Sequence, residues 1–150
     1  MLRVINCISI LVLLSGCVSG VSHTESVDNL YATISVDRQE THVGEPIKIT
    51  FTVKNSGRGA PVRTEIIELK SKPVMDIEVG YFTTTFARWS DQQTPDPSLY
   101  RLELAPNQSR TITLTWIPDD RAYGKPIRIQ GILNWSEERT KDAGVLLPVK

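Results

Sequence analysis

The stretch Pro46-Ile47-Lys48-Ile49-Thr50-Phe51-Thr52-Val53-Lys54 decides the fold, because apolar and polar side chains alternate along it without a break. In an extended strand, successive side chains point to opposite faces of the sheet, so every second residue shares a face. The apolar face consists of Ile47, Ile49, Phe51 and Val53. One buried and one solvent-facing side is typical of an antiparallel sheet. The stretch therefore predicts a strand that covers a hydrophobic core.

The same alternation returns along the chain between short clusters of turn residues. It predicts further strands over residues 31–36, 62–69, 74–79, 81–89, 99–104, 110–116, 127–135 and 145–149, with a bulge or bend at Gly80. No long segment has the apolar stripe of an amphipathic helix. About seven to nine short strands predict an all-β fold, an antiparallel immunoglobulin-like β-sandwich, over residues 30–150.

The first sixteen residues have the layout of a signal peptide. Arg3 gives a basic start, residues 4–14 are mostly apolar, and small residues precede Cys17. As a helix the apolar run would cover roughly 16 Å, about half of a bilayer core near 30 Å thick, which is too short to span it. We therefore expect residues 1–16 to be removed by cleavage between Gly16 and Cys17. Residues 17–29 are small and polar, which predicts a flexible tether that holds His23.

The tetrapeptide Leu14-Ser15-Gly16-Cys17 resembles the bacterial lipobox. The resemblance implies a covalent lipid on Cys17 and a protein anchored in the membrane of the cell envelope. Val18 follows the cysteine, where enterobacterial lipoproteins retained at the inner membrane have an aspartate. The implied location is the outer membrane if the cell has one, and otherwise the outer face of the cytoplasmic membrane. The alternative is an ordinary secretory signal in which these are only small residues near a cleavage site.

Composition excludes several classes of function. Lys plus Arg and Asp plus Glu both number 17, and no basic stripe predicts nucleic-acid binding. The two cysteines are Cys7, inside the signal, and Cys17, so the exported domain is expected to have no disulfide. The two histidines are His23 in the tether and His42 in a turn, and neither lies on a rigid scaffold as a serine–histidine–aspartate site requires. We therefore expect no enzyme.

Two groups of acidic residues are candidate sites. Asp76 and Glu78 share a strand face, which we interpret as the solvent-facing side of a sheet rather than a pair of catalytic carboxylates. Four aspartates in loops are candidate calcium ligands, but their spacing matches no calcium loop. They are Asp91, Asp96, Asp119 and Asp120. The sequence predicts no metal and no cofactor other than the covalent lipid.

A series of short motifs resembles the BsuPI domain family, named for an intracellular proteinase inhibitor. The motifs are Met75-Asp76-Ile77-Glu78-Val79, Ala87-Arg88-Trp89-Ser90-Asp91, Leu102-Glu103-Leu104-Ala105-Pro106-Asn107-Gln108-Ser109, Trp116 and Gly131-Ile132-Leu133. The resemblance implies a β-sandwich and raises the prospect of protease inhibition. The chain departs from the family in its export signal, and Ala105-Pro106-Asn107 replaces the usual Pro-Gly turn.

Two segments are candidates for binding. Arg88 and Trp89 precede a long connection, residues 90–98, that begins with Ser90 and Asp91. The alternative places Trp89 in the core, with Arg88 stacked over it. Tyr123 lies in a second connection, which is otherwise a solvated turn. The sequence thus predicts a membrane-anchored envelope lipoprotein whose non-catalytic sandwich binds a protein or ligand. The alternatives are a proteinase inhibitor that acts through the 90–98 loop and an accessory subunit of an envelope complex.

Overall fold

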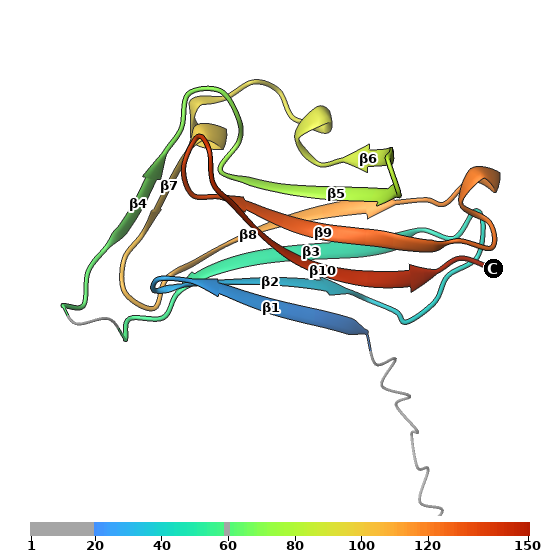
Figure 1. Cartoon of the computed structure of the whole chain (residues 1–150), viewed down its shortest axis with the longest axis horizontal. Helices are drawn as coiled ribbons and strands as arrows, with labels where there is room; N and C mark the ends of the chain where they lie inside the picture. The colour runs from blue at the N-terminus through green and yellow to red at the C-terminus, as the bar shows by residue number, and fades with distance from the viewer. Residues whose placement is uncertain (1–19, 59–60) are drawn as a thin grey trace, which may run out of the picture.

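Two antiparallel sheets pack face to face in the computed structural model, which describes residues 20–58 and 61–150 (Figure 1). The first has the order β1 (Val21–Val27), β2 (Leu30–Val36), β3 (Ile47–Asn55), β8 (Ser109–Trp116). The second has the order β10 (Thr140–Pro148), β9 (Pro126–Asn134), β5 (Met75–Tyr81), β6 (Thr84–Arg88). A short ladder of β4 (Glu65–Glu68) and β7 (Arg101–Leu104) stands at one end. Three 3-10 turns lie in the connections: η1 (Ser90–Gln92), η2 (Pro97–Tyr100) and η3 (Asp120–Ala122).

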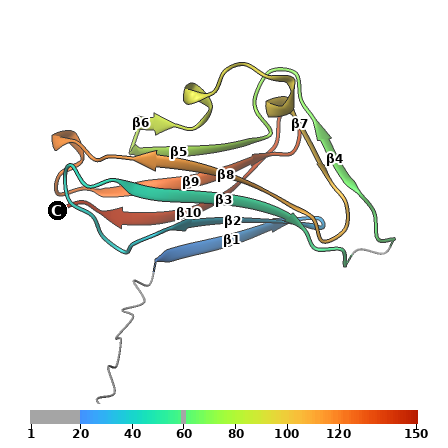
Figure 2. The same cartoon turned by 180° about the vertical axis from the view of Figure 1, so that it is seen from behind.

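The strand order is that of an immunoglobulin-like sandwich. Strands β2, β3 and β8 take the places of strands A, B and E, and β10, β9, β5 and β6 those of G, F, C and C′. Figure 2 shows the β1-β2-β3-β8 sheet from its outer side. The predicted all-β, antiparallel, immunoglobulin-like sandwich is confirmed. Among the described residues, no helix is both long and apolar enough to cross a membrane.

The core is built from the alternating residues that the sequence predicts. In β3, Ile47, Ile49, Phe51 and Val53 are completely buried. The ring of Phe51 lies against the backbone of β9 in the opposite sheet, at Gly131. A Cβ added at Gly131 would stand 2.1 Å from Cδ2 of Phe51, so no larger residue fits there without displacing the ring. This contact fixes the spacing of the two sheets at their centre.

The tether expected over residues 17–29 is wrong where the structure describes it. Residues 21–27 form β1, which pairs with β2 from Val21↔Val36 to Val27↔Leu30, and the sandwich therefore begins at Val21 rather than at residue 30. Val21 and Val27 pack against the core, and the hydroxyl groups of Thr24 and Thr33 are hydrogen-bonded at 2.8 Å. A partly exposed edge strand tolerates small polar residues, which is why its sequence looks like coil. Residues 1–16 and Cys17 lie outside the described residues.

Side chains join the edge strands of the two sheets, β1 and β10. The backbone N–H of Gly144 donates to Nδ1 of His23 at 3.1 Å, and Lys141 forms an ion pair with Glu25 at 3.0 Å. His23 is thus part of the folded domain and not of a tether. These contacts cover one open side of the sandwich and bring the first described residues beside β10.

The remaining strands differ from the predictions mainly at their ends. Residues 62–69 contribute only the four residues of β4, while the edge strand predicted over 145–149 begins earlier, as β10. The register shifts between Val79 and Gly80, as predicted. Residues 81–89 do not form one strand, because the chain turns at Phe82, whose φ is 49°. The chain then returns as β6, and this hairpin brings Arg88 and Ser90 back to β5.

The contact between Phe51 and Gly131 predicts a selective effect of added methyl groups. Gly131→Ala should lower the free energy of unfolding by about 1–3 kcal/mol, because the new Cβ overlaps the ring. Gly144→Ala is the matched control in the same sheet, since the nearest atoms to an added Cβ there are 3.6 Å away. It should change stability by no more than about 0.5 kcal/mol. Urea unfolding measures both, and equal effects of the two variants would contradict the packing described.

Candidate functional site

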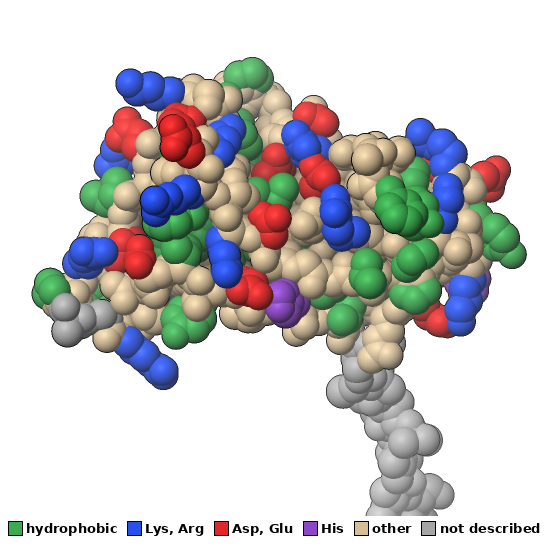
Figure 3. All heavy atoms as spheres, viewed as in Figure 1, with side chains coloured by type: hydrophobic (Ala, Val, Ile, Leu, Met, Phe, Trp, Pro, Cys, Tyr) green, Lys and Arg blue, Asp and Glu red, His purple; other side chains and the backbone are tan. Residues whose placement is uncertain are grey.

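A polar cleft of about 520 Å³ opens on the outer face of the β10-β9-β5-β6 sheet, the face seen in Figures 1 and 3. Strand β5 contributes Asp76 and Glu78, and the end of β6 contributes Arg88 and, just beyond it, Ser90. Polar residues of β9 and β10 form the opposite wall, among them Gln130, Asn134, Thr140 and Asp142. Donors and acceptors from four segments far apart in the sequence therefore face one hollow.

Asp76 is the centre of this cleft. The residue is 5% exposed, and its carboxylate accepts three hydrogen bonds. Oδ1 accepts from the backbone N–H groups of Ile77 at 2.8 Å and Ser90 at 3.0 Å, and Oδ2 accepts from the Ser90 hydroxyl at 2.6 Å. Burial raises the pKa of the Asp76 carboxyl above its ordinary value of 3.8, and the hydrogen bonds from Ser90 oppose this shift without cancelling it. The carboxylate thus holds the start of the 90–98 connection on the sheet.

Glu78 and two arginines form the second charged group of the cleft. Arg88 donates to one carboxylate oxygen of Glu78, and Arg128 approaches the other at 3.8 Å. The hydrogen bond to Glu78 raises the pKa of Arg88, so its charge is fixed. Gln130 donates to Asp142 across the opposite wall at 3.3 Å. The arrangement offers fixed charges and amides for a polar ligand.

Of the five predicted binding residues, two line the cleft and three lie elsewhere. Arg88 and Ser90 line the cleft, whereas Trp89 packs against the core, as the alternative interpretation expects. The predicted stacking of Arg88 over Trp89 is wrong, because its guanidinium turns to Glu78 instead. Asp91 is exposed on η1, outside the lining of the cleft. Tyr123, 67% exposed, follows η3 at the opposite end of the molecule from β4 and β7.

For Asp76, the central residue of the cleft, the sequence predicts a solvent-facing position, whereas the residue is buried. Its side chain does point to the outer face of the sheet, but Ser90 covers it. Ser90 is 14 positions away and arrives only through the β5–β6 hairpin. The alternation of apolar and polar residues along one strand gives no information about contacts with a distant segment, so the burial of Asp76 could not be predicted.

The connection over residues 90–98 is more folded than expected. Its ends form η1 and the start of η2, and Asp96 caps η2 by accepting from the Ser98 N–H at 2.7 Å. Only residues 93–96 lie outside these turns. A second, more apolar hollow of about 480 Å³ lies between this connection and the end of β4, lined in part by Leu69, Pro97 and Tyr100.

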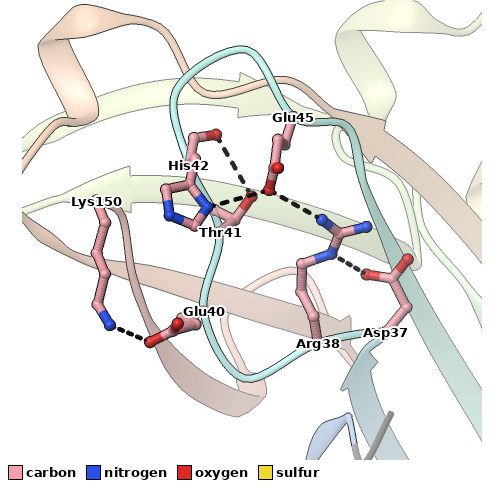
Figure 4. Close-up of polar contacts among 7 residues, drawn as sticks. All are labelled: Asp37, Arg38, Glu40, Thr41, His42, Glu45 and Lys150. Carbon is pink, nitrogen blue, oxygen red and sulfur yellow. Dashed lines mark hydrogen bonds and ion pairs between the residues drawn. The ribbon is translucent and has the colours of Figure 1, made fainter. Parts of the chain in front are cut away.

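A cluster of exposed charges around His42 has a structural role (Figure 4). Glu45 contacts both Arg38, at 3.4 Å, and His42, at 3.3 Å, and Lys150 forms an ion pair with Glu40. In the same loop, the N–H of Thr41 donates to the carbonyl of Pro148. The cluster fastens the C-terminal residues to the 37–46 loop, and its charges are engaged with one another.

Two of the four aspartates considered as calcium ligands have structural roles. Asp96 caps η2, and Asp119 caps η3 while forming an ion pair with Arg121. In residues 20–58 and 61–150, no group of three or more His, Cys, Asp or Glu side chains is arranged to hold a metal ion.

Comparisons with known proteins add little to the assignment of the fold. No family model matches the chain, so the BsuPI resemblance stays a prediction, and no curated protein matches it. Solved structures with similar backbones include the CARDB domain of a Pyrococcus furiosus protein in complex with di-metal ions, at 15% identity and a TM-score of 0.38, covering 85% of this chain and 88% of that one. β-Glucosidases from Erythrobacter marinus and Listeria innocua reach TM-scores of 0.39 and 0.34 at 10% and 13% identity. The alignments cover 85% and 87% of this chain but only 15% and 16% of those enzymes.

Proposed function

We propose that this protein is a cell-envelope lipoprotein, anchored through a lipid on Cys17, whose sandwich binds a polar ligand or a partner protein without catalysis. The observation that carries the binding half of this proposal is the cleft organised by Asp76, where buried and exposed polar groups converge on one hollow. The anchoring half rests on the sequence Leu14-Ser15-Gly16-Cys17.

The distance between the lipid and the domain follows from the position of β1. Strand β1 begins at Val21, so four Cα–Cα steps separate it from Cys17. Fully extended, these steps reach at most about 14 Å. The sandwich would therefore be held against the membrane surface, with little of the freedom that a tether to residue 29 would give.

The cleft is suited to recognition by hydrogen bonds and charge. Arg88 and Lys72 offer positive charge, Asp142 negative charge, and amide and hydroxyl groups lie between them. The Ser90 hydroxyl donates to Asp76 and has no histidine beside it, since His23 lies at the β1–β10 edge and His42 in the charged cluster. Ser90 therefore lacks the serine–histidine pair of a hydrolytic site, and its hydroxyl is held by Asp76, which favours binding over catalysis.

Protease inhibition is a weaker alternative on structural grounds. An inhibitor of this kind presents a rigid extended loop to the protease cleft. Residues 93–96 form the part of the 90–98 loop outside the 3-10 turns, and the Asp96 cap and the bond from Gln93 to the Trp89 carbonyl brace it. The bracing of this exposed segment supports the alternative, and its shortness makes it a weaker candidate than the cleft.

The lipid anchor is tested by replacing the cysteine that would carry it. Cys17→Ala should abolish incorporation of labelled fatty acid and release the protein from membranes, because no acyl chain is attached. Cys7→Ala is the matched control, since this cysteine lies in the predicted signal peptide, and it should leave both properties unchanged. Continued fatty-acid labelling of the Cys17→Ala protein would contradict lipid attachment at this residue.

Binding in the cleft is tested by photo-crosslinking in living cells. A photoreactive amino acid at position 132, in the lining of the cleft, should form a defined adduct with a ligand or partner. The same amino acid at position 111, exposed on the outer face of the other sheet, should not. Mass spectrometry of the purified protein identifies the adducts. Equal yields at the two positions, or no adduct at position 132, would overturn the assignment of the cleft.

A further inference from the structure

The outer face that contains the polar cleft is more apolar where β9 begins and β10 ends. There apolar side chains accompany the exposed Arg128: Leu146, Pro148 and Pro126 are in outward-facing positions of β10 and β9, and Phe82 and Tyr123 are exposed in the adjoining turns. Leu146, Phe82 and Tyr123 are 64%, 78% and 67% exposed. Figure 3 shows hydrophobic side chains gathered on this part of the face. These five residues are called the apolar end below.

The residues of the apolar end lie on neighbouring strands and turns, with Arg128 among them. Leu146 pairs with Arg128, which pairs in turn with Gly80, so one row crosses three strands. Pro148 pairs with Pro126 in the next row. The two turns also meet, because the Lys125 ammonium lies 5.5 Å from the centre of the Tyr81 ring, which itself packs edge-on against Phe82. Exposed apolar surface of this kind commonly marks contact with a membrane or a protein.

The chain leading to Cys17 leaves the sandwich beside this surface. The Gly144 N–H donates to His23, and β1 and β10 run in opposite directions along the shared edge, as the Lys141–Glu25 pair shows. Extended by two residues along each strand, the same alignment would bring Val21 level with Leu146. With at most about 14 Å from Val21 to Cys17, a lipid on Cys17 would enter the membrane next to the apolar end.

The charges around the apolar end are compatible with phospholipid headgroups. Arg128 lies between Leu146 and Gly80, Lys125 lies over the Tyr81 ring, and Arg121 is two residues before Tyr123 in the chain. The carboxylates beside them are paired with arginines, Asp119 with Arg121 and Glu78 with Arg88 and Arg128, while Asp120 is exposed on η3. Tyrosine is also a residue that favours the membrane–water interface.

We infer that the apolar end rests on the lipid surface that holds the anchor, so that the sandwich stands on this end. The inference rests on the proposed lipid at Cys17. Lipid and protein surface then form two membrane contacts instead of one, which fixes orientation as well as location. Positions 128 and 134 of β9 are separated by about 20 Å along the strand, so the cleft would be raised above the headgroups and open to the side.

Fluorescent labels at single cysteines test this contact in the full lipidated protein. The mature chain would offer no other free thiol, because Cys7 leaves with the signal and Cys17 carries lipid. Phe82→Cys and Leu146→Cys probe the apolar end, and Ile66→Cys, at a 55% exposed site on β4, is the control at the far end. Each labelled protein is reconstituted in vesicles of phosphatidylcholine and phosphatidylglycerol.

Labels at positions 82 and 146 should show blue-shifted emission, quenching by brominated lipid and several-fold lower access to aqueous iodide than the label at 66. Equal access to iodide at all three positions of a lipidated protein would overturn the inference while leaving the anchor intact. The inference would also be overturned if the blue shift increased with the density of protein on the vesicles and brominated lipid did not quench the label. In that case a second copy of the protein, rather than lipid, covers the surface. Mass spectrometry of the N-terminal peptide shows independently whether Cys17 carries a lipid. An unmodified Cys17 would contradict the proposed function.

Discussion

The outer face of this sandwich depends on one buried carboxylate. Asp76 accepts from Ile77, its neighbour on β5, and from both the backbone and the hydroxyl of Ser90. A buried carboxylate that lost these donors would be strongly destabilising, so the three bonds and the burial require each other. They fix Ser90 on the sheet, and with it the end of β6, the Arg88–Glu78 pair and the beginning of the 90–98 connection. The wall of the cleft formed by β5 and β6 follows from this arrangement.

The core beneath that face is simpler and independent of it. Phe51 against Gly131 sets the contact of the two sheets, and the β1–β10 edge closes one side. That edge also determines where the proposed anchor leaves the domain. One face then has two parts with different chemistry: an apolar end beside the route to Cys17, and a polar cleft further along β9 and β10. A domain held by the first part would present the second to the envelope.

The core could be predicted from the sequence, and the site could not. Alternation identifies Ile49, Phe51 and Leu114 as buried because each strand's pattern is a local property. It fails at β1, where Ser22, Thr24 and Ser26 resemble coil although β2 supplies every hydrogen bond that an edge strand needs. It also fails to predict the burial of Asp76, because the β5–β6 hairpin brings Ser90 over this residue. The sequence indicates Arg88 and Ser90 as candidate binding residues, but the fold alone brings them to their partners on β5, Glu78 and Asp76.

The pH dependence of stability measures the central claim, the burial of the Asp76 carboxylate. Its raised pKa means that the folded state binds a proton more tightly than the unfolded state, so ionisation of Asp76 lowers stability as pH rises above about 4. Asp76→Asn keeps the shape, and its amide oxygen can accept the two backbone N–H bonds from Ile77 and Ser90. Its NH2 group donates to the Ser90 hydroxyl, which reverses the bond that Oδ2 of Asp76 accepts, and the side chain cannot ionise. The free energy of unfolding of Asp76→Asn minus that of the wild type should therefore increase with pH from about 4 and then level off. A difference that stays constant, or that decreases with pH, would contradict the account.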